Sequence, residues 1–145
     1  MTFPERAQGA SRKTVGLTDP LLLATARLST FVGQNALTSA SGFFFERDGR
    51  LFLVTSGHVM SDEKTEHYPD RVEIELHNDP DNLASSIGFS IPLYRNGKSI
   101  FRQGDDSAGA VDVAVIEIDR AALPAAVLMR AFTPEHLLRN DEAVP

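Results

Sequence analysis

The chain has 145 residues, of which 42% are hydrophobic, and this is long enough for one ordinary domain with a core. Its 20 acidic and 14 basic residues give a net charge of -6 without a basic patch, which argues against nucleic-acid binding. Cysteine is absent, which excludes disulfides, thiolate metal sites and a cysteine nucleophile.

Residues 1–19 are polar and lack apolar periodicity, so we expect a flexible N-terminal arm. The first apolar run, residues 21–24, is too short for a signal-peptide core or a membrane span. We therefore expect no membrane association, and a cytoplasmic location is favoured.

Short strands begin after this arm. Residues 25–31 alternate loosely and are followed by a turn at Gly33-Gln34-Asn35. Two compact apolar runs, 42–45 and 51–54, flank Asp48-Gly49, a dipeptide that favours a tight hairpin turn. This is the clearest hairpin in the sequence.

The pattern of short strands continues beyond a polar loop over residues 61–70. Residues 71–77 alternate strictly between apolar and charged, as in a half-buried antiparallel strand. Residues 87–93 repeat this period, and Asn96-Gly97 predicts another turn. We expect a loop over residues 104–109 and the last strong strand over residues 111–118. Six or so strands without a long amphipathic helix predict an all-β protein, an antiparallel barrel or sandwich.

The end of the chain has a different pattern. Residues 121–145 contain Pro124 and Pro134 and predict turns and one short helix, with Thr133 as its N-cap. We therefore divide the chain into an arm (1–19), a β-domain (20–120) and a C-terminal connecting segment (121–145).

His58 is the first candidate functional residue. It follows the apolar run 51–54 and the small residues Thr55-Ser56-Gly57, where a buried strand ends and the backbone can turn at a glycine. Such a position can present a side chain to a cleft. The alternative is a packed or solvated histidine without a functional role.

Asp112 is the second candidate. In a regular strand it would share a face with Ala114, Ile116 and Ile118. An unpaired carboxylate on that apolar face would be unfavourable, so Asp112 needs a partner. The alternative is a strand-end aspartate that caps nearby backbone N–H groups.

Three motifs in chain order resemble the trypsin/chymotrypsin-like serine protease family, in particular bacterial trypsin-like peptidase domains. They are Ser41-Gly42-Phe43, Thr55-Ser56-Gly57-His58 and Asp112-Val113-Ala114-Val115. The resemblance covers about residues 21–118 and implies an antiparallel six-stranded barrel, the first of two. It also implies that His58 is the catalytic base and Asp112 its orienting partner.

The nucleophilic serine of this family does not follow Asp112. The last serine is Ser107, within Gly104-Asp105-Asp106-Ser107-Ala108-Gly109, and we reject it because the family's serine belongs to the second barrel. The resemblance therefore implies the first barrel of a peptide-bond hydrolase, inactive alone, with no cofactor or metal. Its expected partners are a peptide or protein substrate and a missing C-terminal barrel or a second copy of the chain.

Three other functions remain open. One is a non-catalytic protein-binding module on the same barrel. A second is a metal site built from His67, His77 and the acidic residues Asp62, Glu63, Glu66 and Asp70, although most of these fit a solvated loop. A third is a base-stacking platform of Phe43, Phe44, Phe45 and Phe52, which we expect instead to lie in the core.

Overall fold

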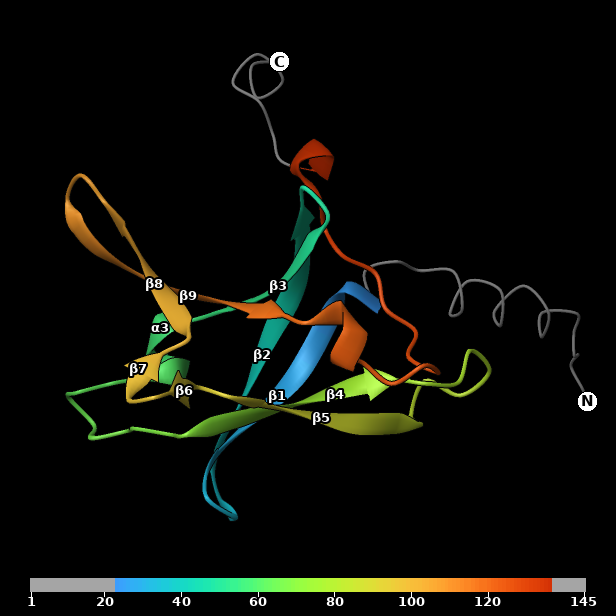
Figure 1. Cartoon of the computed structure of the whole chain (residues 1–145), viewed down its shortest axis with the longest axis horizontal. Helices are drawn as coiled ribbons and strands as arrows, with labels where there is room; N and C mark the ends of the chain where they lie inside the picture. Colours follow the sequence, from blue (N-terminus) through green and yellow to red (C-terminus); the bar gives the residue numbers. More distant parts are fainter. Residues whose placement is uncertain (1–22, 137–145) are drawn as a thin grey trace, which may run out of the picture.

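The computed structural model of the chain describes residues 23–136 (Figure 1). The predicted arm, 1–19, and the last part of the connecting segment, 137–145, lie outside the described residues. Strands dominate the described part, which confirms the all-β prediction. Its elements are β1 (Thr25–Val32), β2 (Asn35–Arg47), β3 (Arg50–Thr55), α3 (Gly57–Met60), β4 (Arg71–His77), β5 (Ser86–Pro92), β6 (Tyr94–Arg95), β7 (Lys98–Ser99), β8 (Phe101–Asp106), β9 (Gly109–Ile118), η1 (Arg120–Ala122) and η2 (Pro134–His136).

Seven of these strands form one antiparallel sheet in the order β5-β4-β1-β2-β3-β9-β8, and β6 and β7 form a separate hairpin. The sequence predicted six strands, and the structure does not bear out that number. Nor does it show a closed barrel, since within residues 23–136 the strand order ends at β5 on one side and at β8 on the other.

The two predicted Asx-Gly turns are confirmed. Asp48 and Gly49 join β2 to β3 with φ of 54° and 78°, and Asn96 and Gly97 join β6 to β7 with φ of 54° and 77°. Two successive residues with positive φ match the twist of the flanking strands, and Asx-Gly is the dipeptide that adopts them most readily. The β2–β3 turn is important for the site, because it returns the chain along the strand that leads to His58.

The predicted loop over residues 104–109 is wrong. Strand β8 continues to Asp106, β9 begins at Gly109, and the two residues between them form a tight turn. The β8–β9 hairpin projects from the body of the sheet, with α3 and the β6–β7 hairpin near its base (Figure 1). The hairpin lies largely in solvent, where a strand needs no alternation of apolar residues. The small and acidic residues of this segment therefore gave no strand signal in the sequence.

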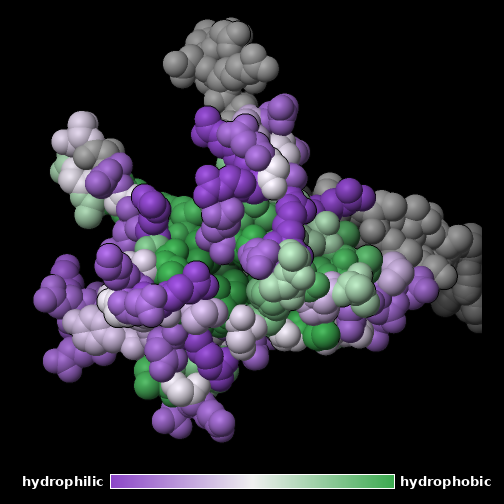
Figure 2. Space-filling model, in the orientation of Figure 1, coloured by the Kyte–Doolittle hydropathy of each residue, from purple (hydrophilic) through white to green (hydrophobic). Residues whose placement is uncertain are grey.

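The core forms from the inward residues of the sheet, including Leu28, Leu53, Ile74 and Ile116, which are at most 1% exposed. The predicted phenylalanine core is correct only in part. Phe44 is buried, whereas Phe43, on the opposite face of β2, is 37% exposed. Apolar residues are visible in the middle of the face shown in Figure 2, between hydrophilic projections. No helix within residues 23–136 is long and apolar enough to cross a membrane.

The segment after η1 packs against the sheet as far as it is described. The Leu128 amide donates to the His77 carbonyl oxygen (2.8 Å), and Phe132 exchanges backbone hydrogen bonds with Phe44 (2.9 Å) and Glu46 (2.7 Å). Leu123, Val127, Met129 and Ala131 contact the core. The predicted helix is a single 3-10 turn, η2, and a role for this segment as an interdomain connection stays a prediction.

Candidate functional site

The backbone turns where β3 ends and thereby presents His58. Ser56 is extended (φ -69°, ψ 144°), and the chain then forms the single helical turn α3. Val59 and Met60 are buried and anchor this turn, while the His58 side chain is 60% exposed. Motif Ser41-Gly42-Phe43 lies opposite, because Gly42 pairs with Thr55 and Phe43 with Val54.

A β-bulge brings Asp112 to the same place. Gln103 of β8 pairs with Ala114 of β9, but the next residue, Gly104, pairs with Val111, so Asp112 and Val113 have no partners on β8. The pairing of β9 with β3 also ends at Ala114. A bulge bends the strand and redirects its side chains, and here Asp112 is directed toward α3.

The two candidate residues are in direct contact, which confirms the proximity expected from the sequence. Asp112 Oδ2 lies 2.8 Å from His58 Nδ1, and Asp112 Oδ1 accepts the backbone N–H of His58, also at 2.8 Å. Both interpretations of Asp112 are therefore realised in one carboxylate, because it binds an imidazole and caps a backbone amide.

This contact defines the proton positions of the imidazole. A carboxylate can only accept a hydrogen bond, so Nδ1 carries the proton, and in the neutral ring Nε2 keeps a free lone pair. The hydrogen bond from the His58 ring, followed by that from the His58 backbone amide, lowers the pKa of Asp112 below its ordinary value of 3.8. The carboxylate is thus ionised at neutral pH, and in the neutral ring the lone pair of His58 Nε2 is the one that can accept a proton.

Gly57 allows this close approach. A Cβ at position 57 would lie 2.9 Å from Asp112 Oδ1 and 3.2 Å from Gln103 Nε2. Its backbone φ is not in the left-handed region, so the requirement for glycine at this position is one of space. The glycine of Thr55-Ser56-Gly57-His58 therefore makes room for the aspartate.

The strand position predicted for Asp112 is wrong. Asp112 was expected on the apolar face of a regular strand, but its side chain is 62% exposed. The bulge and the end of the pairing with β3 place it beyond the buried part of β9. Asp112 does contact His58, as predicted, but burial of the carboxylate is not the reason for this contact.

Two further residues hold α3, and the sequence did not single out either for this role. Gln103 Nε2 donates to the Gly57 carbonyl oxygen (3.3 Å), and His67 Nε2 donates to the Val59 carbonyl oxygen (3.0 Å). The sequence offers His67 only as a candidate metal ligand and gives no role for Gln103. The Gln103 contact joins segments 46 residues apart, and the His67 contact closes an eight-residue segment whose turn the sequence did not predict.

The other candidate residues lie elsewhere. Ser107 is exposed in the β8–β9 turn, and the part of β9 that separates this turn from Asp112, from Gly109 on, spans roughly 10 Å. The residues considered for a metal site have separate contacts: the carboxylate of Asp70 accepts from the Gly33 amide, and His77 Nδ1 donates to the Leu83 carbonyl oxygen. Within residues 23–136 no three histidine or acidic side chains are grouped so as to hold a metal ion.

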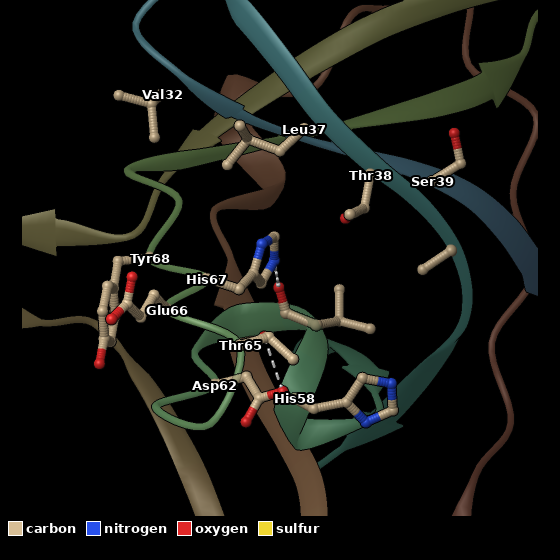
Figure 3. A pocket seen from close by; sticks show the side chains of 12 residues that line it. Val32, Leu37, Thr38, Ser39, His58, Asp62, Thr65, Glu66, His67 and Tyr68 are labelled. Atoms are coloured by element: carbon tan, nitrogen blue, oxygen red, sulfur yellow. Dashed lines mark hydrogen bonds between the residues drawn. The ribbon is translucent and has the colours of Figure 1, made fainter.

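A pocket of about 710 Å³ adjoins His58. One wall is the β1–β2 hairpin, with Val32 and Leu37, and the other is the loop between α3 and β4. Figure 3 shows the His58 ring at the edge of this pocket and the His67 ring pointing into it. A molecule in the pocket would therefore lie beside the imidazole of His58.

Comparisons of the chain with protein-family models, with curated proteins and with solved structures find no match. Inference about function therefore depends on the residues and geometry described above.

Proposed function

We propose that this chain provides the histidine–aspartate part of a trypsin-like serine endopeptidase site. The observation that carries the proposal is the double contact of Asp112 with His58, through Nδ1 and through the backbone amide, both at 2.8 Å. This arrangement fixes one tautomer and one orientation of the ring, as a general base requires.

In this proposal His58 Nε2 takes the proton of a serine hydroxyl as the oxygen attacks a peptide carbonyl. The imidazolium then gives that proton to the leaving amine, and water repeats the cycle on the acyl-enzyme. Asp112 stays ionised throughout and stabilises the imidazolium. No serine follows Asp112 in the 145 residues, so the nucleophilic serine of this proposal lies outside them.

We also propose that the sheet is the first barrel of the trypsin-like type. One core contains residues from both edge strands, Ile91 of β5 and Phe101 of β8, together with Ile116 of β9, so the sheet curls around a common interior. Leu93 bonds to both Asp70 and Ile100 through its backbone and links the two edges through the β6–β7 hairpin. The shared core and the backbone hydrogen bonds of Leu93 both support closure of the barrel.

The decisive experiment begins with the gene. If the reading frame beyond the codon for Pro145 encodes a Gly-x-Ser-Gly segment, the whole product is expressed and assayed for peptidase turnover and for labelling of the serine by a fluorophosphonate. We expect Asp112→Asn to reduce kcat by about four orders of magnitude, as in related triads, and His58→Ala to abolish labelling.

A competing function is the protein-binding module. It would be favoured by a stop codon at this position in the gene without such a segment, or by a full product whose activity survives both substitutions. The proposal places the nucleophile outside the 145 residues. His58-dependent turnover by the purified 145-residue chain would contradict it, because such turnover would require a nucleophile within this sequence.

A further inference from the structure

Exposed apolar side chains gather at the pocket beside His58. Three of the six large hydrophobic side chains that are exposed within residues 23–136 line it: Val32 (43%), Leu37 (42%) and Tyr68 (50%). Exposed apolar side chains that gather at a concave site mark a binding surface more often than scattered ones do.

The charge of this pocket is one-sided. Asp62 and Glu66 line it, and it contains no lysine or arginine. Glu66 and Tyr68 both line the pocket, and Figure 3 shows them on its side away from His58. The pocket therefore offers both a carboxylate and an aromatic ring, the two groups that attract guanidinium and ammonium ions.

The acidic wall has a fixed shape. Asp62 and His67 exchange backbone hydrogen bonds at 2.9 Å, and Thr65 Oγ1 donates to Asp62 Oδ2 at 2.9 Å. His67 Nε2 then ties this loop to α3 through the Val59 carbonyl oxygen. The loop therefore presents its carboxylates from a closed turn of the backbone and not from a freely moving segment.

The apolar wall of the pocket, formed by the β1–β2 hairpin, is also held by hydrogen bonds. The Gly33 amide donates to Asp70 Oδ2 (3.0 Å), and Arg71 Nε donates to the Gly33 carbonyl oxygen (3.1 Å). The Arg71 guanidinium also lies 4.0 Å from the centre of the Phe31 ring. These contacts set the β1–β2 hairpin opposite the acidic loop, so the pocket does not have to form when a ligand binds.

We propose that this pocket binds an extended protein segment through one arginine or lysine side chain. The aliphatic stem packs against Val32 and Leu37, while the charged end reaches Glu66 and Tyr68. A volume of about 710 Å³ accommodates such a side chain together with adjoining peptide backbone. Because long basic side chains are apolar along the stem and charged at the tip, they match both walls at once.

The pocket borders His58, so its role in selecting a peptidase substrate rests on the proposed function. Binding itself does not, because it needs neither the serine nor turnover. Loss of binding would leave the peptidase proposal intact, and loss of turnover would leave the binding proposal intact.

The test is an NMR titration of the ¹⁵N-labelled 145-residue chain with two blocked pentapeptides that differ only at the central residue, arginine in one and citrulline in the other. We expect shift changes at the amides of Leu37, Glu66 and Tyr68 with the arginine peptide, and affinity about three- to tenfold lower for citrulline. Equal affinity for the two peptides, or no shift changes up to millimolar peptide, would overturn the proposal.

Variants locate the cation. Glu66→Gln is expected to weaken the arginine peptide about two- to fivefold. Glu63→Gln is the matched control, because it removes the same charge from the same loop at a residue that does not line the pocket, and it should change affinity by less than about twofold. Equal effects of the two substitutions would show a diffuse attraction and would refute a defined site.

Discussion

Gly57→Ala tests the geometry of the candidate site most directly. The new methyl carbon would lie 2.9 Å from Asp112 Oδ1, whereas ordinary contact begins near 3.4 Å. The backbone φ of Gly57 suits alanine, and the clashing atom belongs to a side chain that can rotate away. We therefore expect the variant to fold and the carboxylate to withdraw.

The size of this movement follows from the distances. To restore ordinary contact, the carboxylate must move by about 0.5 Å. Its bonds to His58, at 2.8 Å, would lengthen to about 3.3 Å, outside the usual range of about 2.7–3.2 Å for N–H···O bonds. The carboxylate would lose the contacts that lower its pKa.

The assay is a pH titration of the Asp112 side-chain carbon by ¹³C NMR. In the wild type, hydrogen bonds from His58 place the pKa of Asp112 below 3.8, and in Gly57→Ala we expect it to rise toward that value. In the same variant we expect the Nδ1 proton of His58 to exchange faster with water, because it loses its hydrogen-bond acceptor.

Gly104→Ala is the control. It makes the same substitution beside the bulge, but its new methyl carbon would have no neighbour closer than 3.7 Å. The pKa of Asp112 should stay at its wild-type value. An Asp112 pKa that remains equally low in Gly57→Ala would show that the glycine is not what admits the carboxylate, and the spatial argument would fail.

Three further predictions concern the supporting structure. Gly42→Ala would place a methyl carbon 2.7 Å from a carbonyl oxygen of β3, and we expect a loss of about 1–3 kcal/mol in urea unfolding, whereas an unchanged midpoint would contradict this. Thr30→Val removes a buried hydroxyl that bonds Thr38 Oγ1 at 2.7 Å, which should cost about 1 kcal/mol, and thermal unfolding unaffected by the change would contradict it. The Arg50 hydrogen bond lowers the pKa of Glu117, so its stabilising effect is present above pH 4.5 and is lost as the pH falls through the folded pKa; ¹³C titration of Arg50→Met should return that pKa toward 4.5, and no change would refute the cause.

Much of the fold was predictable because its signals are local. Strict alternation over residues 71–77 identified β4, since one face of an antiparallel strand meets the core and the other meets solvent. Asp48-Gly49 identified the β2–β3 turn, because few other dipeptides adopt positive φ at both positions. By contrast, the β8–β9 hairpin has no buried face near its turn, so it left no alternation to detect.

The packing of the segment after η1 was also beyond prediction. Phe132 joins the strand residue Phe45 in an isolated bridge and packs edge-on against the Phe43 ring, at 5.7 Å between centroids. These partners are almost ninety positions away in the chain, and nothing in residues 121–136 marks them out. Contacts at such separation depend on the final curvature of the sheet.

The sequence by itself predicted that His58 and Asp112 are partners, and their contact confirms this, whereas the family that their motifs resemble stays a prediction. It also predicted β3, which leads to His58, and β9, which carries Asp112, from apolar runs and turn residues whose effects are local. Only the tertiary structure decided how they meet. The bulge at Asp112, the space at Gly57 and the pocket beside His58 each arise where segments distant in sequence come into contact, and no short-range pattern encodes such contacts.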